Sequence, residues 1–435
     1  MAPTPEKLRI RAYNVGFGDC FLLSFHYAED DSRHMLIDFG TTHPAKSGAP
    51  KSMTQVAEQI AEDCDGKLHV VVATHRHADH VSGFAGAPGE IIAGLDPDLV
   101  VQPWTERPDL APDATAPSVV RSGGGVTGSK AAVAQLANVH LVAEVVTRDI
   151  PRLAASKTVP RTVIEQLEFL GADNVRNSDA VHALARLGRK RVYANFGSKL
   201  PVRRLLPGVD IDVLGPPTLR QSTAVSRQAR VSDEFWHLTA SSARARLSGT
   251  GGTPIFPRAE TERTFPQEAR WVIPRIDRTN AEETLSIVRI LDEVMNNTSL
   301  ILLLDVGGTL LLFPGDAQLE NWSYALRDAP NAAEIRARVA GTRVYKVGHH
   351  GSLNATPKTL LWSAFSRAAP DVAPDERLIT VVSTCAGQHG SEARGTEVPR
   401  RTLVSELEAR TTYVTTQKGT TAKAFWRDVE LALSP

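Results

Sequence analysis

Short apolar runs punctuated by glycines mark the first quarter of the chain. The runs are rich in β-branched, aromatic and aliphatic side chains, and turn residues separate them, so they predict strands. We expect these strands at residues 10–13, 20–25, 35–39 and 69–74. Between Met53 and Cys64 the apolar side chains of Val56 and Ile60 recur at helical spacing, which predicts a helix there.

Strand-like and helix-like patterns continue through the rest of the chain. Residues 129–188 are predicted to be mostly helical, and two further helices are expected near 282–294 and 402–410. Further strands are predicted at residues 191–194, 209–214, 300–305, 309–313, 343–347 and 378–383. Because both halves contain strand-rich and helix-rich segments, we predict an α/β fold built as a layered sandwich.

Two stretches lack such periodicity. Residues 105–130 are rich in Pro, Ala, Gly and Ser and are predicted to form a mobile loop. Residues 218–267 are polar, with several arginines, and are predicted to form an insertion. A chain of 435 residues is long enough for one elaborated domain or two modest ones. We expect a single domain over residues 1–435 that carries both stretches.

The composition excludes several classes of protein. The chain is 42% hydrophobic, and its 49 Lys and Arg residues balance 49 Asp and Glu residues, as in a globular protein that does not coat nucleic acid. Cys20, Cys64 and Cys385 form no CxxC pair, so neither a disulfide framework nor a zinc ribbon is expected. The longest aliphatic run, 300–304, is too short to span a membrane, and no apolar signal core precedes the first strand. We therefore expect a cytoplasmic protein without a membrane segment.

Four potential metal ligands are packed into six positions after the strand at 69–74. His75, His77, Asp79 and His80 offer the imidazole and carboxylate groups that zinc, manganese or iron accept. In an extended segment His75 and His77 point the same way, whereas Asp79 and His80 begin the next turn and face another point. One loop could thus serve two metal centres. The alternative interpretation is a polar loop of surface histidines.

The pattern HxHxDH after a buried strand resembles the metallo-β-lactamase superfamily, whose fold is a four-layer αββα sandwich with its metals at one edge of the sheets. The resemblance implies that Asp316, which follows a strand and a glycine, bridges the metals, and that Asp38 orients the metal loop from beneath. Either aspartate could instead be an ordinary turn residue. His349 and His350 both match the final histidine of the family. We expect His349 to be the ligand and His350 to contact substrate or solvent.

One departure from the superfamily narrows the resemblance. Residues 296–299, Asn-Asn-Thr-Ser, stand where many members have a further histidine. The first site would then be less completely caged, and we expect one or two divalent ions, zinc or manganese. Residues 13–19, 297–299 and 349–352 together resemble the soluble hydrolase domain of ComEC, the DNA-uptake channel protein. That resemblance implies supporting roles beside the metal ligands for Asp19 and Asn297.

The implied chemistry is hydrolysis, because adjacent divalent ions activate water and stabilise both oxygens of a displacement. Under the family resemblance the catalytic side chains are expected to be Asp79, His80, Asp316, His350 and His389. The resemblance implies that His389 closes over the site, and the alternative is an exposed loop histidine. The stretch 186–204 is basic, and Arg189, Lys190 and Arg191 within it are candidates for binding a nucleic acid or a nucleotide-like substrate. A solvated basic face explains this stretch nearly as well.

We therefore expect a metal-dependent phosphodiesterase or nuclease. One alternative is a hydrolase of the same fold that acts on an acyl, lactam or thioester bond, since this fold serves many substrates. The other is a non-catalytic module that binds nucleic acid or a protein partner.

Overall fold

A computed structural model describes residues 3–28, 31–45, 49–108, 177–222, 295–352, 355–388 and 397–433, with a few isolated positions between 116 and 285. Contacts divide the chain into two compact units. The fold described below belongs to the unit formed by residues 1–110, 177–222 and 295–435. Nearly all of the second unit, residues 111–176 and 223–294, lies outside the described residues. The single-domain expectation for 1–435 therefore stays a prediction.

The first sheet is mixed and has the strand order β13-β1-β2-β3-β4-β5-β6. Neighbouring strands pair antiparallel from β13 through β1 and β2 to β3, and β3, β4, β5 and β6 are parallel. In chain order the strands are β1 (Lys7–Tyr13), β2 (Cys20–His26), β3 (Ser32–Phe39), β4 (Val70–Val72), β5 (Leu99–Pro103), β6 (Lys190–Ala194) and β13 (Trp426–Ala432).

The second sheet is also mixed and has the order β12-β11-β10-β9-β8-β7. Strands β9 to β12 run parallel, whereas β7, β8 and β9 pair antiparallel. The strands are β7 (Val209–Gly215), β8 (Ile301–Val306), β9 (Thr309–Phe313), β10 (Val344–Lys346), β11 (Ile379–Val382) and β12 (Thr412–Thr415).

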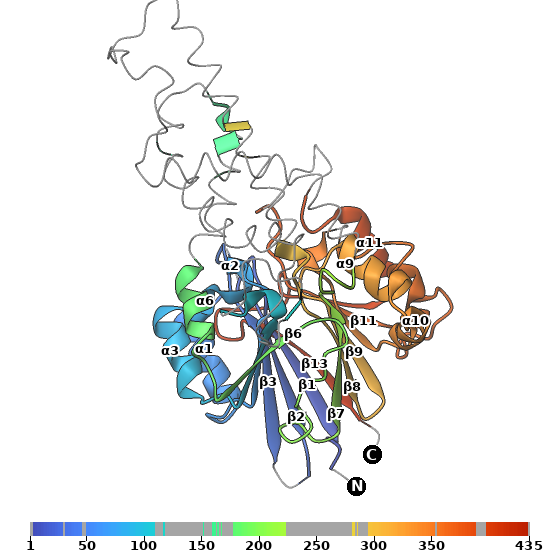
Figure 1. The fold of residues 1–435 in the computed structure, drawn as a ribbon, viewed down its shortest axis with the longest axis horizontal. Coiled ribbons are helices and arrows are strands. Elements are labelled where there is room, and N and C mark those ends of the chain that lie inside the picture. Colours follow the sequence, from blue (N-terminus) through green and yellow to red (C-terminus); the bar gives the residue numbers. More distant parts are fainter. Residues whose placement is uncertain are drawn as a thin grey trace, which may run out of the picture. The chain divides into compact units, whose positions relative to one another are not determined.

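Three buried apolar clusters hold the sheets and helices together. The central cluster joins side chains of both sheets, among them Leu23 and Met35 of the first and Leu302 and Leu311 of the second. A second cluster packs the first sheet against the helices α1 (Met53–Asp63), α3 (Gly86–Gly94) and α6 (Ser178–Leu184). A third packs the second sheet against α9 (Leu319–Ser323), α10 (Ala332–Ala340) and α11 (Arg401–Arg410). In Figure 1 these two groups of helices lie on opposite sides of the pair of sheets.

The predicted α/β class is confirmed, with two mixed sheets and helices. Every predicted strand is present, with ends that differ by three residues or fewer, and the helices expected at 53–64 and 402–410 are α1 and α11. Of the predicted loop at 105–130, Thr105 and Glu106 lie in a short 3-10 turn and most of the rest is outside the described residues. The predicted insertion at 218–267 and the helix at 282–294 also fall mostly outside them. Within the part of the chain that is described, no helix has the length and apolar character needed to cross a bilayer.

The ends of parallel strands from both sheets meet at one edge of the fold. The backbone N–H of Leu300, which precedes β8, donates to the carbonyl of Thr74, which follows β4, at 2.9 Å. The hydroxyl of Ser383, which follows β11, donates to the carbonyl of Gly18 at 2.6 Å. Loops that are distant in sequence therefore converge where β3, β4, β9 and β10 end.

Away from this edge, two buried histidines predict how acid affects stability. The backbone N–H of His34 donates to Nδ1 of the His69 ring at 3.1 Å. The ring Nδ1 of His34 lies 3.1 Å from the Ser24 hydroxyl. Burial lowers the pKa of His34 to about 3 and that of His69 to about 4. Both rings stay neutral in the folded protein down to these values, whereas the unfolded chain takes up protons near pH 6.5. The free energy of unfolding should therefore fall by a few kcal/mol between about pH 6.5 and pH 4.

Urea unfolding of the chelator-treated protein at pH 7, 6, 5 and 4 measures this loss. His69→Gln retains an acceptor for the His34 N–H but does not titrate, so its stability should fall less steeply with pH. The exposed His182 provides the control, and His182→Gln should follow the parent. Parallel pH profiles for the parent and His69→Gln would contradict the assignment.

Candidate metal centre

The metal loop, residues 74–81, leaves β4 and turns into the short helix α2 (Ala78–Val81). Asp38, just inside the end of the neighbouring strand β3, anchors its start. The carboxylate of Asp38 accepts hydrogen bonds from the backbone N–H and the hydroxyl of Thr74, both at 2.7 Å. Asp38 has a φ of +58°, a left-handed conformation that non-glycine residues seldom adopt and that often marks functional sites.

Two glycines allow neighbouring backbone to lie directly against the metal loop. A Cβ at Gly40 would lie 2.5 Å from the carbonyl oxygen of Ala78, and a Cβ at Gly18 would lie 2.7 Å from that of Asp79. The N–H of Asp19 donates to the same Asp79 carbonyl at 2.8 Å. The loop is therefore fixed from beneath by backbone contacts that larger residues would prevent.

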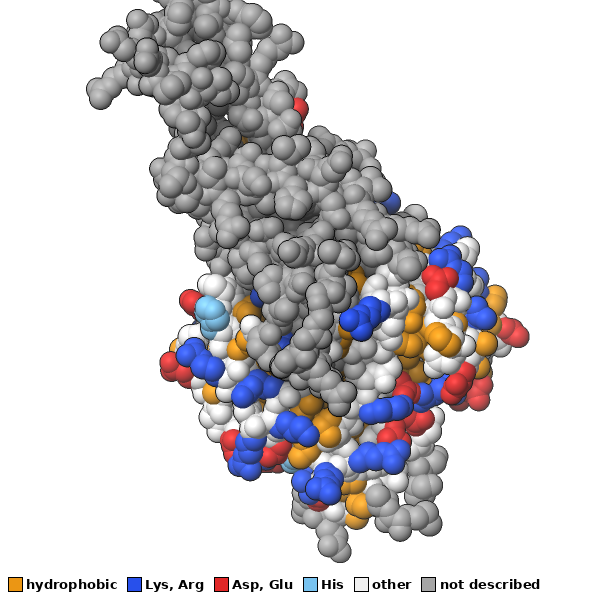
Figure 2. All heavy atoms as spheres, viewed as in Figure 1, with side chains coloured by type: hydrophobic (Ala, Val, Ile, Leu, Met, Phe, Trp, Pro, Cys, Tyr) orange, Lys and Arg blue, Asp and Glu red, His pale blue; other side chains and the backbone are white. Residues whose placement is uncertain are grey.

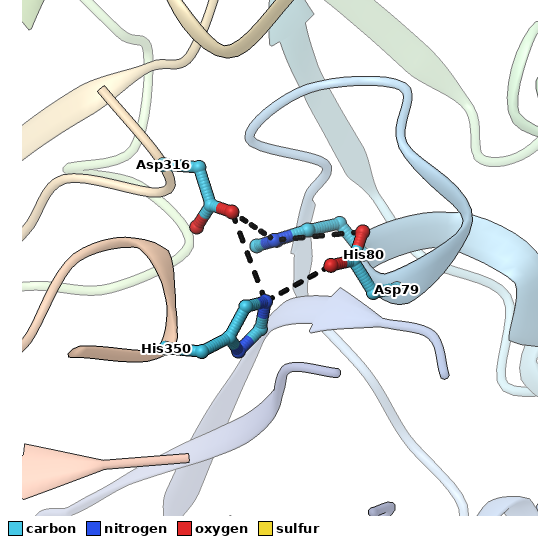
Figure 3. A group of neighbouring side chains, drawn as sticks. All are labelled: Asp79, His80, Asp316 and His350. Carbon is cyan, nitrogen blue, oxygen red and sulfur yellow. Dashed lines mark hydrogen bonds and ion pairs between the residues drawn. The ribbon is translucent and has the colours of Figure 1, made fainter. Parts of the chain in front are cut away.

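A group of four buried side chains meets at the strand ends (Figure 3). Asp79 and His80 come from α2, Asp316 follows β9, and His350 follows β10. One potential ligand atom from each lies within 4.8 Å of the others. Nε2 of His80 lies 3.2 Å from Oδ2 of Asp316, and Nε2 of His350 lies 3.0 Å from Oδ2 of Asp79. Two carboxylates and two imidazoles thus face a common point.

The orientation of both histidines is set by contacts on their far side. Nδ1 of His80 donates to Oδ2 of Asp38 at 2.8 Å, and Nδ1 of His350 donates to the carbonyl of Ser383 at 3.0 Å. Each ring therefore presents Nε2 to the group, the arrangement typical of histidine ligands held by an outer carboxylate or carbonyl. Nε2 of His80 is buried and makes no hydrogen bond with any described residue.

A second group shares Asp79 with the first. His75, His77 and Asp79 also bring ligand atoms within 4.8 Å of one another. Nε2 of His75 lies 3.0 Å from Nδ1 of His77, which lies 3.1 Å from the side-chain oxygen of Asn296. Burial lowers the pKa of His75 well below its usual value and that of His77 to about 4, so both are neutral near pH 7. Two facing ring nitrogens at this distance require a shared proton or a cation between them.

In the first group, the charges of the carboxylates and imidazoles shift one another's pKa values. Burial alone would raise the pKa values of Asp79 and Asp316, but the neighbouring His80 and other cationic groups outweigh it and lower both. Burial likewise disfavours charge on His80 and His350, yet the surrounding carboxylates raise the pKa of each. The metal-free site therefore balances its carboxylates with protonated imidazoles, and a divalent ion would replace those protons.

A buried lysine, Lys346, adjoins Asp19 and Asp316. Lys346, at the end of β10, forms an ion pair with Asp19 and lies 3.5 Å from Oδ1 of Asp316. Its ammonium also donates to the carbonyl of Gly315 at 3.1 Å. Burial opposes the charge on Lys346, but Asp19 and Asp316 raise its pKa further than burial lowers it. Asp19, Asp38 and His80 form a third group whose ligand atoms lie within 4.8 Å.

These residues fit a first-row divalent ion. The donors are imidazole nitrogens and carboxylate oxygens, which suit zinc or manganese, and they are buried where unpaired charge is costly. The inward-facing Nε2 of His80 is a potential metal ligand that forms an ion pair with Asp316 but no hydrogen bond with a described residue. The fold thus builds a buried cluster of His and Asp residues compatible with a metal site.

His349 and His350 differ in burial and in which of them lies with the other candidate ligands, and the arrangement is not the one we expected. His350 is fully buried and belongs to the group of four, whereas 26% of the His349 side chain is exposed and its Nε2 lies 3.9 Å from Oδ2 of Asp316. Both have positive φ values, +46° and +51°, so the backbone turns sharply between them. The structure therefore groups His350, not His349, with Asp79, His80 and Asp316.

Asn297, expected beside the ligands, makes other contacts. Its amide nitrogen donates to Glu320 at 3.1 Å, and its side-chain oxygen accepts from the N–H of Gln318 at 3.3 Å. The neighbouring Asn296 is the residue that reaches His77. His389 lies outside the described residues.

The candidate substrate-binding residues do not reach the site. Arg189 is paired with Asp96 and Asp98. Lys190 begins β6 in register with Leu99 and hence with Val70, at the strand end opposite the metal loop, and Arg191 follows it. Because a strand rises about 3.3 Å per residue, Lys190 lies on the order of 15 Å from the level of the loop. In Figure 2, Lys and Arg side chains are interspersed with Asp and Glu across the visible described surface.

Sequence reasoning missed several residues that position the ligands. Thr74 donates hydrogen bonds to the carboxylate of Asp38. The hydroxyl of Ser299 accepts a hydrogen bond from the backbone N–H of Asp316 at 3.2 Å. Lys346 and Asn296 were also missed as contacts of the ligands. The only available signal was proximity in sequence, since Thr74 precedes the loop and Lys346 precedes the histidine pair.

No model of a known protein family matches the chain, and no curated protein matches it. The case for a metal site therefore rests on the arrangement of its own residues.

The arrangement predicts which histidine of the pair binds metal. His350→Ala removes one member of the group of four, so the affinity for Zn²⁺ should fall roughly a hundredfold or more. That loss exceeds the one typical of residues that only support ligands. His349→Ala should cost less than about tenfold. Calorimetric titration of chelator-stripped protein with Zn²⁺ measures both, and equal losses, or a larger loss for His349→Ala, would show that the grouping is incorrect.

Proposed function

We propose that this protein is a metal-dependent hydrolase of the metallo-β-lactamase type, with one or two divalent ions held by its buried His and Asp groups. The observation that carries the proposal is the shared carboxylate: Asp79 belongs both to the group with His75 and His77 and to the group with Asp316 and His350. Ligand groups that share a carboxylate are suited to adjacent ions. The packing of two sheets between two sets of helices supports the αββα architecture that the motif implies.

Ions bound in these groups would supply Lewis acidity and a water of lowered pKa. The chain's own residues hold and orient the ligands. Asp38 fixes the ring of His80, and the Ser383 carbonyl fixes that of His350. The side chain of His349 is partly exposed and lies 3.9 Å from Asp316, which supports a role for this histidine in contacting a substrate.

A phosphodiester is the substrate class that we favour. Support comes from the resemblance of residues 13–19, 297–299 and 349–352 to the ComEC-like hydrolase domain, which is a feature of the sequence. Arg189, Lys190 and Arg191 lend no support, because they lie at the opposite strand end and Arg189 is paired with Asp96 and Asp98. Acyl, lactam and thioester bonds are the alternatives for the same site.

Turnover of chromogenic substrates tests the proposal. With Zn²⁺ or Mn²⁺ added, the protein should hydrolyse a chromogenic phosphodiester faster than a chromogenic lactam or thioester. The Asp79→Ala, His80→Ala double variant removes donors from both groups, so its rate should fall to background. Circular dichroism should show that this variant is folded.

Arg189→Ala provides the matched control, because Arg189 is charged but distant from the site; this variant should keep the parent rate. A double variant as active as the parent would refute the hydrolase assignment. Faster cleavage of the lactam or thioester would leave the metal site intact and overturn the substrate class.

A further inference from the structure

Lys346 is a buried cation for which the proposed hydrolysis has no evident use. Only 2% of its side chain is exposed, and its ammonium contacts Asp19, the Gly315 carbonyl and Oδ1 of Asp316. Burying an ammonium group is costly unless it is paired with opposite charge and hydrogen-bonded. Its position beside a ligand group therefore calls for an explanation.

The charge around the site explains why a cation is needed. Asp19, Asp38, Asp79 and Asp316 are all buried. Among the described residues, no Lys or Arg other than Lys346 forms an ion pair with any of these four carboxylates. Their other charged partners are histidines. Within the described part of the chain, the ammonium of Lys346 is thus the one Lys or Arg charge that forms an ion pair with these carboxylates.

We propose that Lys346 is a fixed internal cation that competes with metal ions for the charge of Asp19 and Asp316 and so lowers the metal affinity of the site. In the metal-free protein the same ammonium keeps these carboxylates paired, so the site is formed before an ion arrives. The inference rests on the proposed metal site and adds a residue that sets its affinity.

Asp316 does not depend on Lys346 for its orientation. Its Oδ1 also accepts from the N–H of His349 at 3.1 Å, and its own N–H donates to Ser299 at 3.2 Å. Removing the ammonium therefore leaves one contact that holds the carboxylate, from the His349 N–H, and one that holds the backbone of Asp316, to Ser299. The repulsion between an ammonium and a divalent ion bound by the same carboxylate exceeds a tenfold effect on binding even with strong dielectric screening. The electrostatic gain should outweigh the lost contact.

Three variants separate charge from shape. Lys346→Met keeps the length of the side chain and removes its charge, so the dissociation constant for Zn²⁺ should fall at least about tenfold. Asp19→Asn removes one negative charge and leaves Lys346 in place, so binding should weaken by a similar factor. The double variant restores the net charge of the parent and should bind with an affinity close to that of the parent.

The measurement is calorimetric titration of chelator-stripped protein with Zn²⁺, with the thermal midpoint recorded in excess chelator and in excess Zn²⁺. Lys346→Met should lower the midpoint more in chelator than in Zn²⁺, because an ion replaces the lost charge. Lys418→Met is the control: this lysine is 78% exposed and pairs with Glu408, so both readouts should match the parent.

Each outcome decides the matter. If Lys346→Met binds no more tightly than the parent, the inference fails while the metal site stands. If that variant does not fold without metal, Asp19→Asn and the double variant decide: equal affinities for these two would overturn it. A parent that takes up no ion would overturn the proposed function and this inference together.

Discussion

Four carboxylates buried at one edge of two sheets impose the constraint that the rest of the site must satisfy. Asp19, Asp38, Asp79 and Asp316 are each less than one-tenth exposed, and carboxylates so placed repel one another unless positive charge lies between them. The fold brings a lysine and several imidazoles to the same place. A single divalent ion would neutralise the remaining negative charge of these carboxylates. We therefore interpret the cluster as a candidate metal centre.

The topology explains how segments far apart in sequence supply one site. Parallel strands end at the same edge of a sheet, and two such sheets share a core here, so the loops after β3, β4, β9 and β10 converge. The convergence has a backbone cost: Asp38, His349 and His350 adopt positive φ values. Hydrogen bonds from Thr74 and to Ser383 offset part of that cost and fix the directions in which the side chains point.

The sequence predicted what is local and missed what depends on packing. Candidate ligands that are close in sequence, as in the segment 75–80, and apolar runs that form strands can be recognised from the sequence alone. Strands β12 and β13 were not predicted, although Val429 and Leu431 of β13 alternate with Asp428 and Glu430 in the pattern of a half-buried strand. Whether His349 or His350 faces the ligand group depends on backbone dihedral angles, which two identical neighbouring side chains do not reveal.

The central claim is that these imidazoles and carboxylates bind cations in the folded protein. Crystals grown with Mn²⁺ or Zn²⁺ and measured at the absorption edge of the metal test it directly. We predict an anomalous peak enclosed by Asp79, His80, Asp316 and His350, within coordination distance of each. A well-ordered site without such a peak, with the metal only on the surface, would contradict the account.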